Sequence, residues 1–142
     1  MKTIPYRRKI NYYETDRMSI VHHSNYARYL EEARMDFMRQ VGISYDDLEE
    51  KGIVIPVLEL HDQYIKSLTF GDEIEIQISL IKLTAVRFKM KYEIINIATG
   101  EVVHKAETAH CFVEPGLVPL NLKKHFPEVY EVFEKYLEPE EN

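Results

Sequence analysis

What the sequence lacks already restricts the location and kind of protein that it can encode. Its 142 residues include one cysteine, Cys111, so no intrachain disulfide can form and nothing points to an oxidising compartment. No apolar run approaches the roughly 20 residues of a membrane-spanning helix. The first ten residues contain no apolar core of signal-peptide length. We therefore expect a cytoplasmic protein without a membrane span.

Positive charge is also scarce in the sequence. The 18 Lys and Arg residues are outnumbered by 24 Asp and Glu residues, which gives a formal net charge of −6. A nucleic-acid binder normally carries net positive charge or a basic stripe, so we expect no nucleic-acid partner. A local basic pocket for a phosphorylated ligand stays compatible with this balance. The spacings of a zinc site and of a P-loop are absent as well, and we expect neither a metal nor a cofactor.

The length and composition of the chain fit one domain. A chain of 142 residues is long enough to bury a core of its own. Hydrophobic residues make up 45% of it and charged residues 30%, both near the values of soluble globular proteins. Because no repeat, linker or low-complexity segment interrupts the chain, we expect residues 1–142 to form a single domain.

The clearest element of secondary structure is a helix in residues 24–41. Apolar side chains recur there with the 3.6-residue period of a helix, and they form a broad aromatic stripe suited to packing on a sheet. The stripe consists of Tyr26, Tyr29, Leu30, Ala33, Phe37 and Val41. Ser24 or Asn25 can cap the first turn, and Gly42 stands where helices commonly end in a left-handed residue.

Two further helices are predicted. Residues 44–52 form a short helix with an acidic start, in which Ser44 and Asp47 occupy the positions of a capping box. A C-terminal helix has Pro127 in its first turn. Its apolar stripe consists of Val129, Val132, Phe133, Tyr136 and Leu137. The tail, residues 138–142, is expected to fray.

The other segments show the two-residue period of half-buried strands. The predicted strands are residues 5–13, 53–70, 73–80, 86–94 and 101–114. We expect the acidic face of the third of these strands to pair with the basic face of the fourth. One strand, a long helix and then a run of antiparallel strands predict an α+β fold with the helix on one face of the sheet.

Residues suited to chemistry lie just before the long helix. Asp16 lies in a polar turn, and His22 and His23 follow it directly before the helix begins at about Ser24. A carboxylate beside the unpaired N–H groups of a helix N-terminus provides a base or nucleophile together with donors for an oxyanion. This combination suits attack on a carbonyl carbon.

The same segment resembles the signature of a known enzyme family. It contains the pattern TDxxSIVxHxxY from Thr15 to Tyr26, followed in the helix by EEAR at residues 31–34. This pattern is similar to that of the 4-hydroxybenzoyl-CoA / YbgC-like acyl-CoA thioesterases, and the similarity in element order extends over nearly the whole chain. The resemblance implies the hotdog fold, in which an antiparallel sheet of about five strands wraps around one long central helix, here with a C-terminal helix added. It also implies hydrolysis of an acyl-CoA thioester to the free acid and CoA.

The resemblance also implies roles for individual residues. Asp16 acts as a nucleophile that attacks the thioester carbonyl or as a general base that activates water, and the sequence leaves both roles open. Backbone N–H groups near His23 and Ser24 hold the oxyanion. His23, rather than His22, hydrogen-bonds the thioester or positions water. The residues expected to contact the substrate are Arg17, Met18, Ser24, Asn25, Tyr26 and Tyr64.

Several of these residues have simpler structural interpretations. Many family members carry a small pair after the Asp, whereas the bulk of Arg17 and Met18 can narrow the site or contact the acyl group. Asp16 can be a plain turn former, Asn25 a helix cap and Tyr64 a packed side chain. Three other histidines lack metal-ligand partners at suitable spacing and are expected to be structural or surface residues. They are His61, His104 and His110.

Two other functions stay open at this point. One is an acyl-thioester hydratase or dehydratase on the same fold, and the other is a non-catalytic module that binds acyl-CoA or an acyl-carrier protein. The expected partner is an acyl-CoA substrate, with acyl-carrier protein as the alternative thioester. We also expect a homodimer or homotetramer with the active site at the subunit interface. The length or aromaticity of the acyl group and the residues that bind the CoA phosphates do not follow from the sequence.

Overall fold

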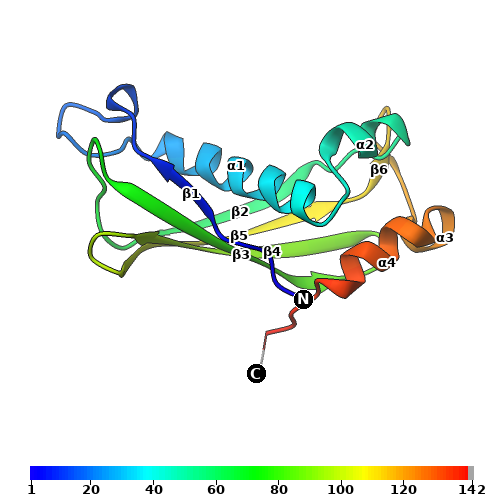
Figure 1. Cartoon of the computed structure of the whole chain (residues 1–142). Coiled ribbons are helices and arrows are strands. Elements are labelled where there is room, and N and C mark those ends of the chain that lie inside the picture. The colour runs from blue at the N-terminus through cyan, green and yellow to red at the C-terminus, as the bar shows by residue number, and fades with distance from the viewer. Residues whose placement is uncertain (141–142) are drawn as a thin grey trace.

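One antiparallel sheet and the long helix that lies along its face make up most of the molecule (Figure 1). The computed structural model describes residues 1–140, and its five-stranded sheet has the order β1-β3-β4-β5-β2. The strands are β1 (Tyr6–Lys9), β2 (Val57–Tyr64), β3 (Glu73–Leu83), β4 (Arg87–Asn96) and β5 (Glu101–Cys111), with a separate pair β6 (Val113–Glu114) and β7 (Val118–Pro119). The helices are α1 (Ser24–Gln40), α2 (Tyr45–Glu50), α3 (Leu122–His125) and α4 (Pro127–Lys135), with a 3-10 turn over Tyr12–Glu14. This arrangement confirms the predicted α+β hotdog fold.

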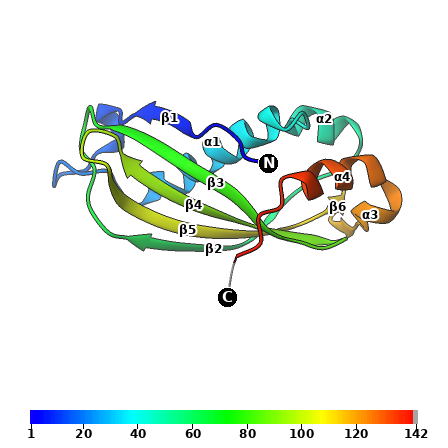
Figure 2. The same cartoon turned by 60° about the horizontal axis from the view of Figure 1, so that its bottom comes forward.

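The two ends of the sheet carry different structures. The segment between β1 and α1 lies at one end, and α3 and α4 pack at the opposite end (Figures 1 and 2). The candidate residues of that first segment are therefore far from the C-terminal helices. Within the described residues, no helix combines the length and the apolar character needed to cross a membrane.

The helix α1 forms where the apolar period predicted it. Its stripe is buried from Tyr26 to Phe37, and Gly42 follows it with a φ of +88°. The predicted caps are wrong. His23 occupies the N-cap position, and its φ of −54° and ψ of −28° are helical. Side-chain capping requires an extended residue at this position, so no side chain caps the helix. The Ser24 N–H instead donates to Nδ1 of His22 at 3.2 Å.

Three strands are shorter than predicted. The strand predicted over residues 101–114 ends at Cys111, and Val113–Glu114 form β6 of the separate pair. The predicted strand over residues 5–13 ends at Lys9, because the chain turns into the 3-10 segment and leaves Tyr12 exposed. The predicted strand over residues 53–70 is reduced to β2, which lies at one edge of the sheet. An edge position agrees with Pro56 just before the strand, since proline cannot donate a ladder hydrogen bond.

The predicted charge pairing between β3 and β4 is also wrong. The register places the acidic residues of β3 opposite β1, so that Glu75 pairs with Arg7 at 3.0 Å and Glu73 with Lys9 at 3.5 Å. On the β4 side, Ile95 lies opposite Glu75. The acidic face of β3 therefore finds its cations on β1.

The predicted helices outside α1 are present with shorter bounds. Ser44 Oγ accepts the Asp47 N–H at 3.2 Å and caps α2, and Pro127 is the first residue of α4. The tail is held at its start, because the Glu138 N–H donates to the Leu80 carbonyl at 2.7 Å. The predicted fraying of residues 138–142 is thus contradicted at Glu138, and residues 141–142 lie outside the described part.

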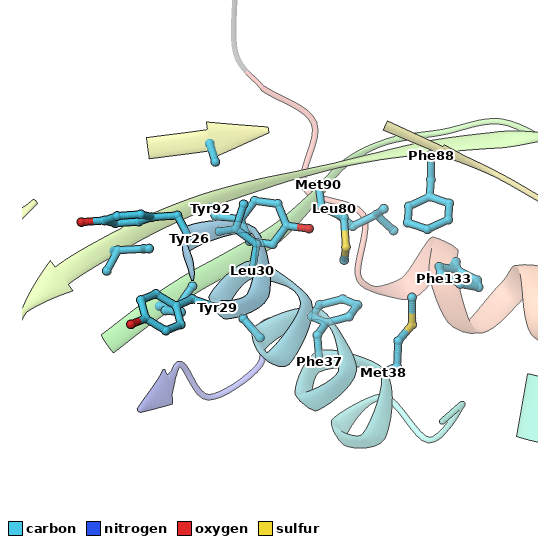
Figure 3. Close-up of a cluster of buried hydrophobic side chains, with 14 of the residues drawn as sticks. Tyr26, Tyr29, Leu30, Phe37, Met38, Leu80, Phe88, Met90, Tyr92 and Phe133 are labelled. Carbon is cyan, nitrogen blue, oxygen red and sulfur yellow. The ribbon is translucent and has the colours of Figure 1, made fainter. Parts of the chain in front are cut away.

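The hydrophobic core lies between α1 and the inner face of the sheet. Figure 3 shows Phe37 and Met38 of α1 facing Leu80 and Met90 of the sheet. At the end that carries α4, the rings of Phe88, Phe112 and Phe133 contact one another with centroids about 5.3–5.5 Å apart. This packing fixes α1, and with it the start of the helix, against the sheet.

A chain of buried polar groups crosses this core. The Arg34 guanidinium of α1 donates to the Tyr92 hydroxyl at 3.0 Å, and that hydroxyl lies 2.7 Å from Thr108 Oγ1. His110 continues the chain, since its Nε2 lies 2.8 Å from the same Thr108 oxygen. Burial, with a smaller effect of the Arg34 charge, lowers the pKa of His110 to about 4. His110 is therefore neutral in the folded protein near neutral pH.

This neutral histidine predicts loss of stability in mild acid. The unfolded chain takes up a proton at His110 near its ordinary pKa of about 6.5, whereas the folded protein does so only near pH 4. The free energy of unfolding should thus fall as the pH drops from about 6.5 to 4, by on the order of 3 kcal/mol. Urea unfolding at several pH values will measure this slope. The variant His110→Gln, which cannot titrate, should show a clearly smaller slope, and an equal slope would contradict the assignment.

Candidate active site

Asp16 lies at the tip of a small hairpin that leads into α1. Thr15 and Val21 pair as an isolated antiparallel bridge, and the Asp16 N–H donates to the Ile20 carbonyl at 2.8 Å. The Ser19 N–H donates back to the Asp16 carbonyl at 2.9 Å. Ser19 has a φ of +65°, a left-handed conformation that closes the turn. Residues other than glycine adopt this conformation at a cost in free energy. The hairpin, residues 14–22, therefore holds the acid close to the helix start.

The Asp16 carboxylate serves the turn with one of its oxygens. Its Oδ1 accepts the Met18 N–H at 2.7 Å, the bond of an Asx turn. The structural interpretation of Asp16 as a turn former is thus correct. Asp16 also lines a surface hollow of about 280 Å³. We call this space the Asp16 hollow.

The Asp16 hollow gathers four residues predicted for the site: Asp16, His23, Tyr26 and Tyr64. Its other lining residues are Ile20, Val21, Ile65, Lys66 and Ser67. The hairpin and the start of α1 supply one wall, while the end of β2 and the loop after it supply the other. The hollow therefore combines polar and apolar side chains, as suits a thioester whose carbonyl reacts beside an apolar acyl group.

The remaining predicted contacts lie outside this hollow. Arg17 and Met18 are exposed, and Met18 at 75% is among the most exposed apolar side chains. The Ser24 hydroxyl lies 2.8 Å from His22 Nδ1. Asn25 is buried, and its amide donates to the Glu14 carbonyl at 2.9 Å. None of these four side chains lines the Asp16 hollow, so their contact with substrate stays a prediction.

One backbone donor at the start of α1 is available to a ligand. The N–H groups of Ser24, Asn25 and Tyr26 are engaged, by His22 Nδ1 and by the carbonyls of His22 and His23. For the His23 N–H, no acceptor lies within residues 1–140. His23 lines the Asp16 hollow, and the dipole of a 17-residue helix adds positive potential at this point. A carbonyl oxygen that gains negative charge here could accept this N–H.

Sequence reasoning missed a partly buried pair of residues beside the hollow. His104 Nε2 lies 2.6 Å from Asp62 Oδ1, and the His104 side chain is fully buried. The His104 ring stacks on Tyr26 at 4.3 Å between centroids and meets the edge of Tyr64 at 4.8 Å. Burial lowers the pKa of His104 more than Asp62 raises it, so a neutral imidazole supports the two tyrosines.

The two tyrosines that this pair supports are themselves neutral. Burial raises the pKa of Tyr26 to about 12, so its hydroxyl keeps its proton at neutral pH. No local motif indicates this pair, because Asp62 and His104 meet only through the pairing of β2 with β5. The wall of the hollow thus depends on residues that the hairpin motif does not contain.

Comparison with known proteins gives consistent similarities. Residues 10–129 match the model of the thioesterase-like superfamily. The chain is 38% identical to a predicted esterase of Aquifex aeolicus over 87% of this chain and 94% of the relative. It is 31% identical to a predicted acyl-CoA thioesterase of Bacillus subtilis, YneP, over 89% and 92%. A solved DHNA-CoA thioesterase of Staphylococcus aureus is 32% identical, with a TM-score of 0.88 over 93% of this chain and 89% of that one.

Proposed function

This chain belongs to the thioesterase-like superfamily and is a thioester hydrolase. We propose that it hydrolyses an acyl-CoA to the free acid and CoA, and that the reaction takes place at the Asp16 hollow. The observation that carries the proposal is that Asp16 and His23 line one hollow, and that the His23 N–H has no acceptor within the described residues. The first can supply a nucleophile or base and the second a place for the oxyanion.

The proposed reaction begins with the thioester carbonyl between these two groups. As a nucleophile, the Asp16 carboxylate attacks the carbonyl carbon, the carbon–sulfur bond breaks, CoA leaves as the thiolate, and water hydrolyses the resulting mixed anhydride. As a general base, Asp16 takes a proton from a water that attacks the same carbon, the carbon–sulfur bond breaks, and CoA leaves as the thiolate, which receives the proton from Asp16. In both routes the His23 N–H stabilises the oxyanion. The His23 side chain borders the hollow and is proposed to orient the thioester or the water.

A second copy of the chain is proposed to complete the site. β2 is an edge strand with an exposed apolar surface, and an unpaired edge of this kind favours association. Its exposed apolar side chains are Val57, Leu58, Leu60 and Tyr64. Because Tyr64 and the neighbouring Ile65 also line the Asp16 hollow, a partner at this edge would border the substrate. Sedimentation should give twice the chain mass or four times it, and a monomer at micromolar concentration would contradict the proposal.

The choice of CoA as the carrier rests on the names of relatives above 30% identity. Two of the three relatives described above are named as CoA thioesterases. The narrower placement in the 4-hydroxybenzoyl-CoA / YbgC-like branch is part of the proposal, supported by the TDxxSIVxHxxY pattern alone. A cytoplasmic location is proposed as well, supported by the single Cys111.

Thiol release tests this function directly. The purified protein is incubated with aromatic, short-chain and long-chain acyl-CoAs, and the free thiol is followed with a chromogenic disulfide. Rapid release from at least one class is expected, and the preferred class identifies the acyl group. Absence of release with every acyl-CoA would contradict the proposal. Thiol release from an acyl-carrier protein thioester alone would show that the carrier is acyl-carrier protein and not CoA. Hydration of an enoyl-CoA without thiol release would favour the hydratase.

A further inference from the structure

One backbone carbonyl joins the Asp16 hairpin to the first turn of α1. The Glu14 carbonyl accepts the His22 N–H at 2.9 Å, which closes the open end of the hairpin. It also accepts the side-chain amide of Asn25 at 2.9 Å. Glu14 lies two residues before Asp16, and Asn25 lies two residues after His23, so this carbonyl links the segment of the proposed acid to the segment of the proposed oxyanion donor.

The Glu14 carbonyl is itself held firmly in place. Glu14 is 5% exposed, and its carboxylate contacts Arg8 at 2.6 Å and accepts the Asn11 N–H at 2.8 Å. Arg8 also reaches Glu32 on α1 at 2.8 Å and lies over the Tyr29 ring of the same helix at 4.4 Å. The base of the hairpin is thereby anchored to β1, where Arg8 is located, and to α1.

The Asn25 side chain is buried, and both ends of its amide group face a partner within the protein. It is 6% exposed and lies inside α1, and its Oδ1 faces Nη1 of Arg28 at 3.4 Å. Its amide therefore faces the hairpin and its carbonyl oxygen faces Arg28. Asn25 does not line the Asp16 hollow, and its amide contacts the protein itself, at the Glu14 carbonyl.

We propose that Asn25 is a positioning residue, whose bond to the Glu14 carbonyl fixes the distance between the Asp16 carboxylate and the His23 N–H. This inference rests on the proposed function. Attack on a carbonyl requires the reacting group and the oxyanion donor to be placed together, and a displacement of about 1 Å can lower the rate about 100-fold. Loss of the Asn25 bond lets the hairpin move relative to α1 while the rest of the substrate site stays intact.

Two variants of Asn25 test the proposal, because a positioning residue should change kcat and leave KM almost unchanged. Asn25→Asp keeps the shape of the side chain and its contact with Arg28 but removes the donor to Glu14. Asn25→Ala removes both contacts. Each is expected to lower kcat by about 10- to 100-fold with KM changed by less than about threefold. The matched control is Asn121→Ala, because Asn121 holds the start of α3 through the Lys124 N–H at 3.0 Å, far from the hairpin.

Hydrogen exchange of the His22 amide gives a second readout that does not depend on activity. The exchange should be faster in Asn25→Ala than in Asn121→Ala or the wild type, since the carbonyl that accepts this amide loses its second donor. Wild-type exchange together with wild-type kcat in both Asn25 variants would overturn the proposal. If instead the wild type releases no thiol, the proposed function fails. In that case the exchange rate alone decides whether Asn25 holds the hairpin.

Discussion

Replacing Asp16 with asparagine should lower kcat/KM for acyl-CoA hydrolysis by about 10³-fold while the fold is retained. Asparagine keeps the Oδ1 acceptor for the Met18 N–H, so the Asx turn and the hairpin stay intact. It supplies neither a nucleophile nor a base of useful strength. The loss should appear in kcat, because the carboxylate acts in the transition state and contributes little to binding of the CoA portion.

A matched control for this variant lies in the loop before β3. Asp72 also uses its carboxylate in a turn, where Oδ2 accepts the Thr69 N–H at 2.8 Å. Asp72→Asn should leave kcat/KM within about threefold of the wild type, because Asp72 does not line the Asp16 hollow. Thiol release is measured for both variants with the preferred acyl-CoA. Wild-type hydrolysis by Asp16→Asn would remove Asp16 from the mechanism.

Replacing Arg8 with methionine should lower the free energy of unfolding by about 3–5 kcal/mol. The side chains of Arg8 and Glu14 are only 12% and 6% exposed, so methionine leaves a buried carboxylate without its cation. The neighbouring Arg7 provides the control, because its ion pair with Glu75 is made by a side chain that is 67% exposed. Arg7→Met should cost less than about 1 kcal/mol.

Urea unfolding of the two arginine variants separates these expectations. A similar, small loss in both would show that the Arg8–Glu14 pair contributes no more than a surface pair. A large loss for Arg8→Met alone would identify this pair as a main anchor of the hairpin base. Because the anchored carbonyl of Glu14 holds both His22 and Asn25, the stability of this pair and the geometry of the site are then connected.

Much of the fold follows from local sequence patterns, and the predictions failed where the outcome depends on burial or on strand order. The 3.6-residue stripe located α1, and the two-residue period located the central strands, because each face buries or exposes its side chains regularly. The pattern did not show that the chain leaves β1 after Lys9, since Tyr12 continues the apolar alternation although it is exposed. The pairing of Glu75 with Arg7 depends on strand order, which periodicity does not specify.

The residues of the site that are neighbours in the sequence could be predicted, whereas those that meet only through strand pairing could not. Asp16, His23 and Tyr26 lie within one motif, and the hairpin and α1 bring them together because they are neighbours in the chain. The supporting pair of Asp62 and His104 could not be predicted, since it forms only through the register of β2 and β5. The motif could not reveal the internal role of a buried asparagine either.

The central claim is that the thioester carbonyl lies between Asp16 and the His23 N–H. The most direct measurement is a crystal structure with an acyl-CoA analogue in which a methylene group replaces the thioester sulfur. We predict a carbonyl oxygen about 2.7–3.1 Å from the His23 nitrogen. We also predict a carbonyl carbon within about 3.5 Å of the Asp16 carboxylate or of a water that it holds. An analogue that binds with its carbonyl elsewhere, while Asp16 faces solvent, would contradict the account.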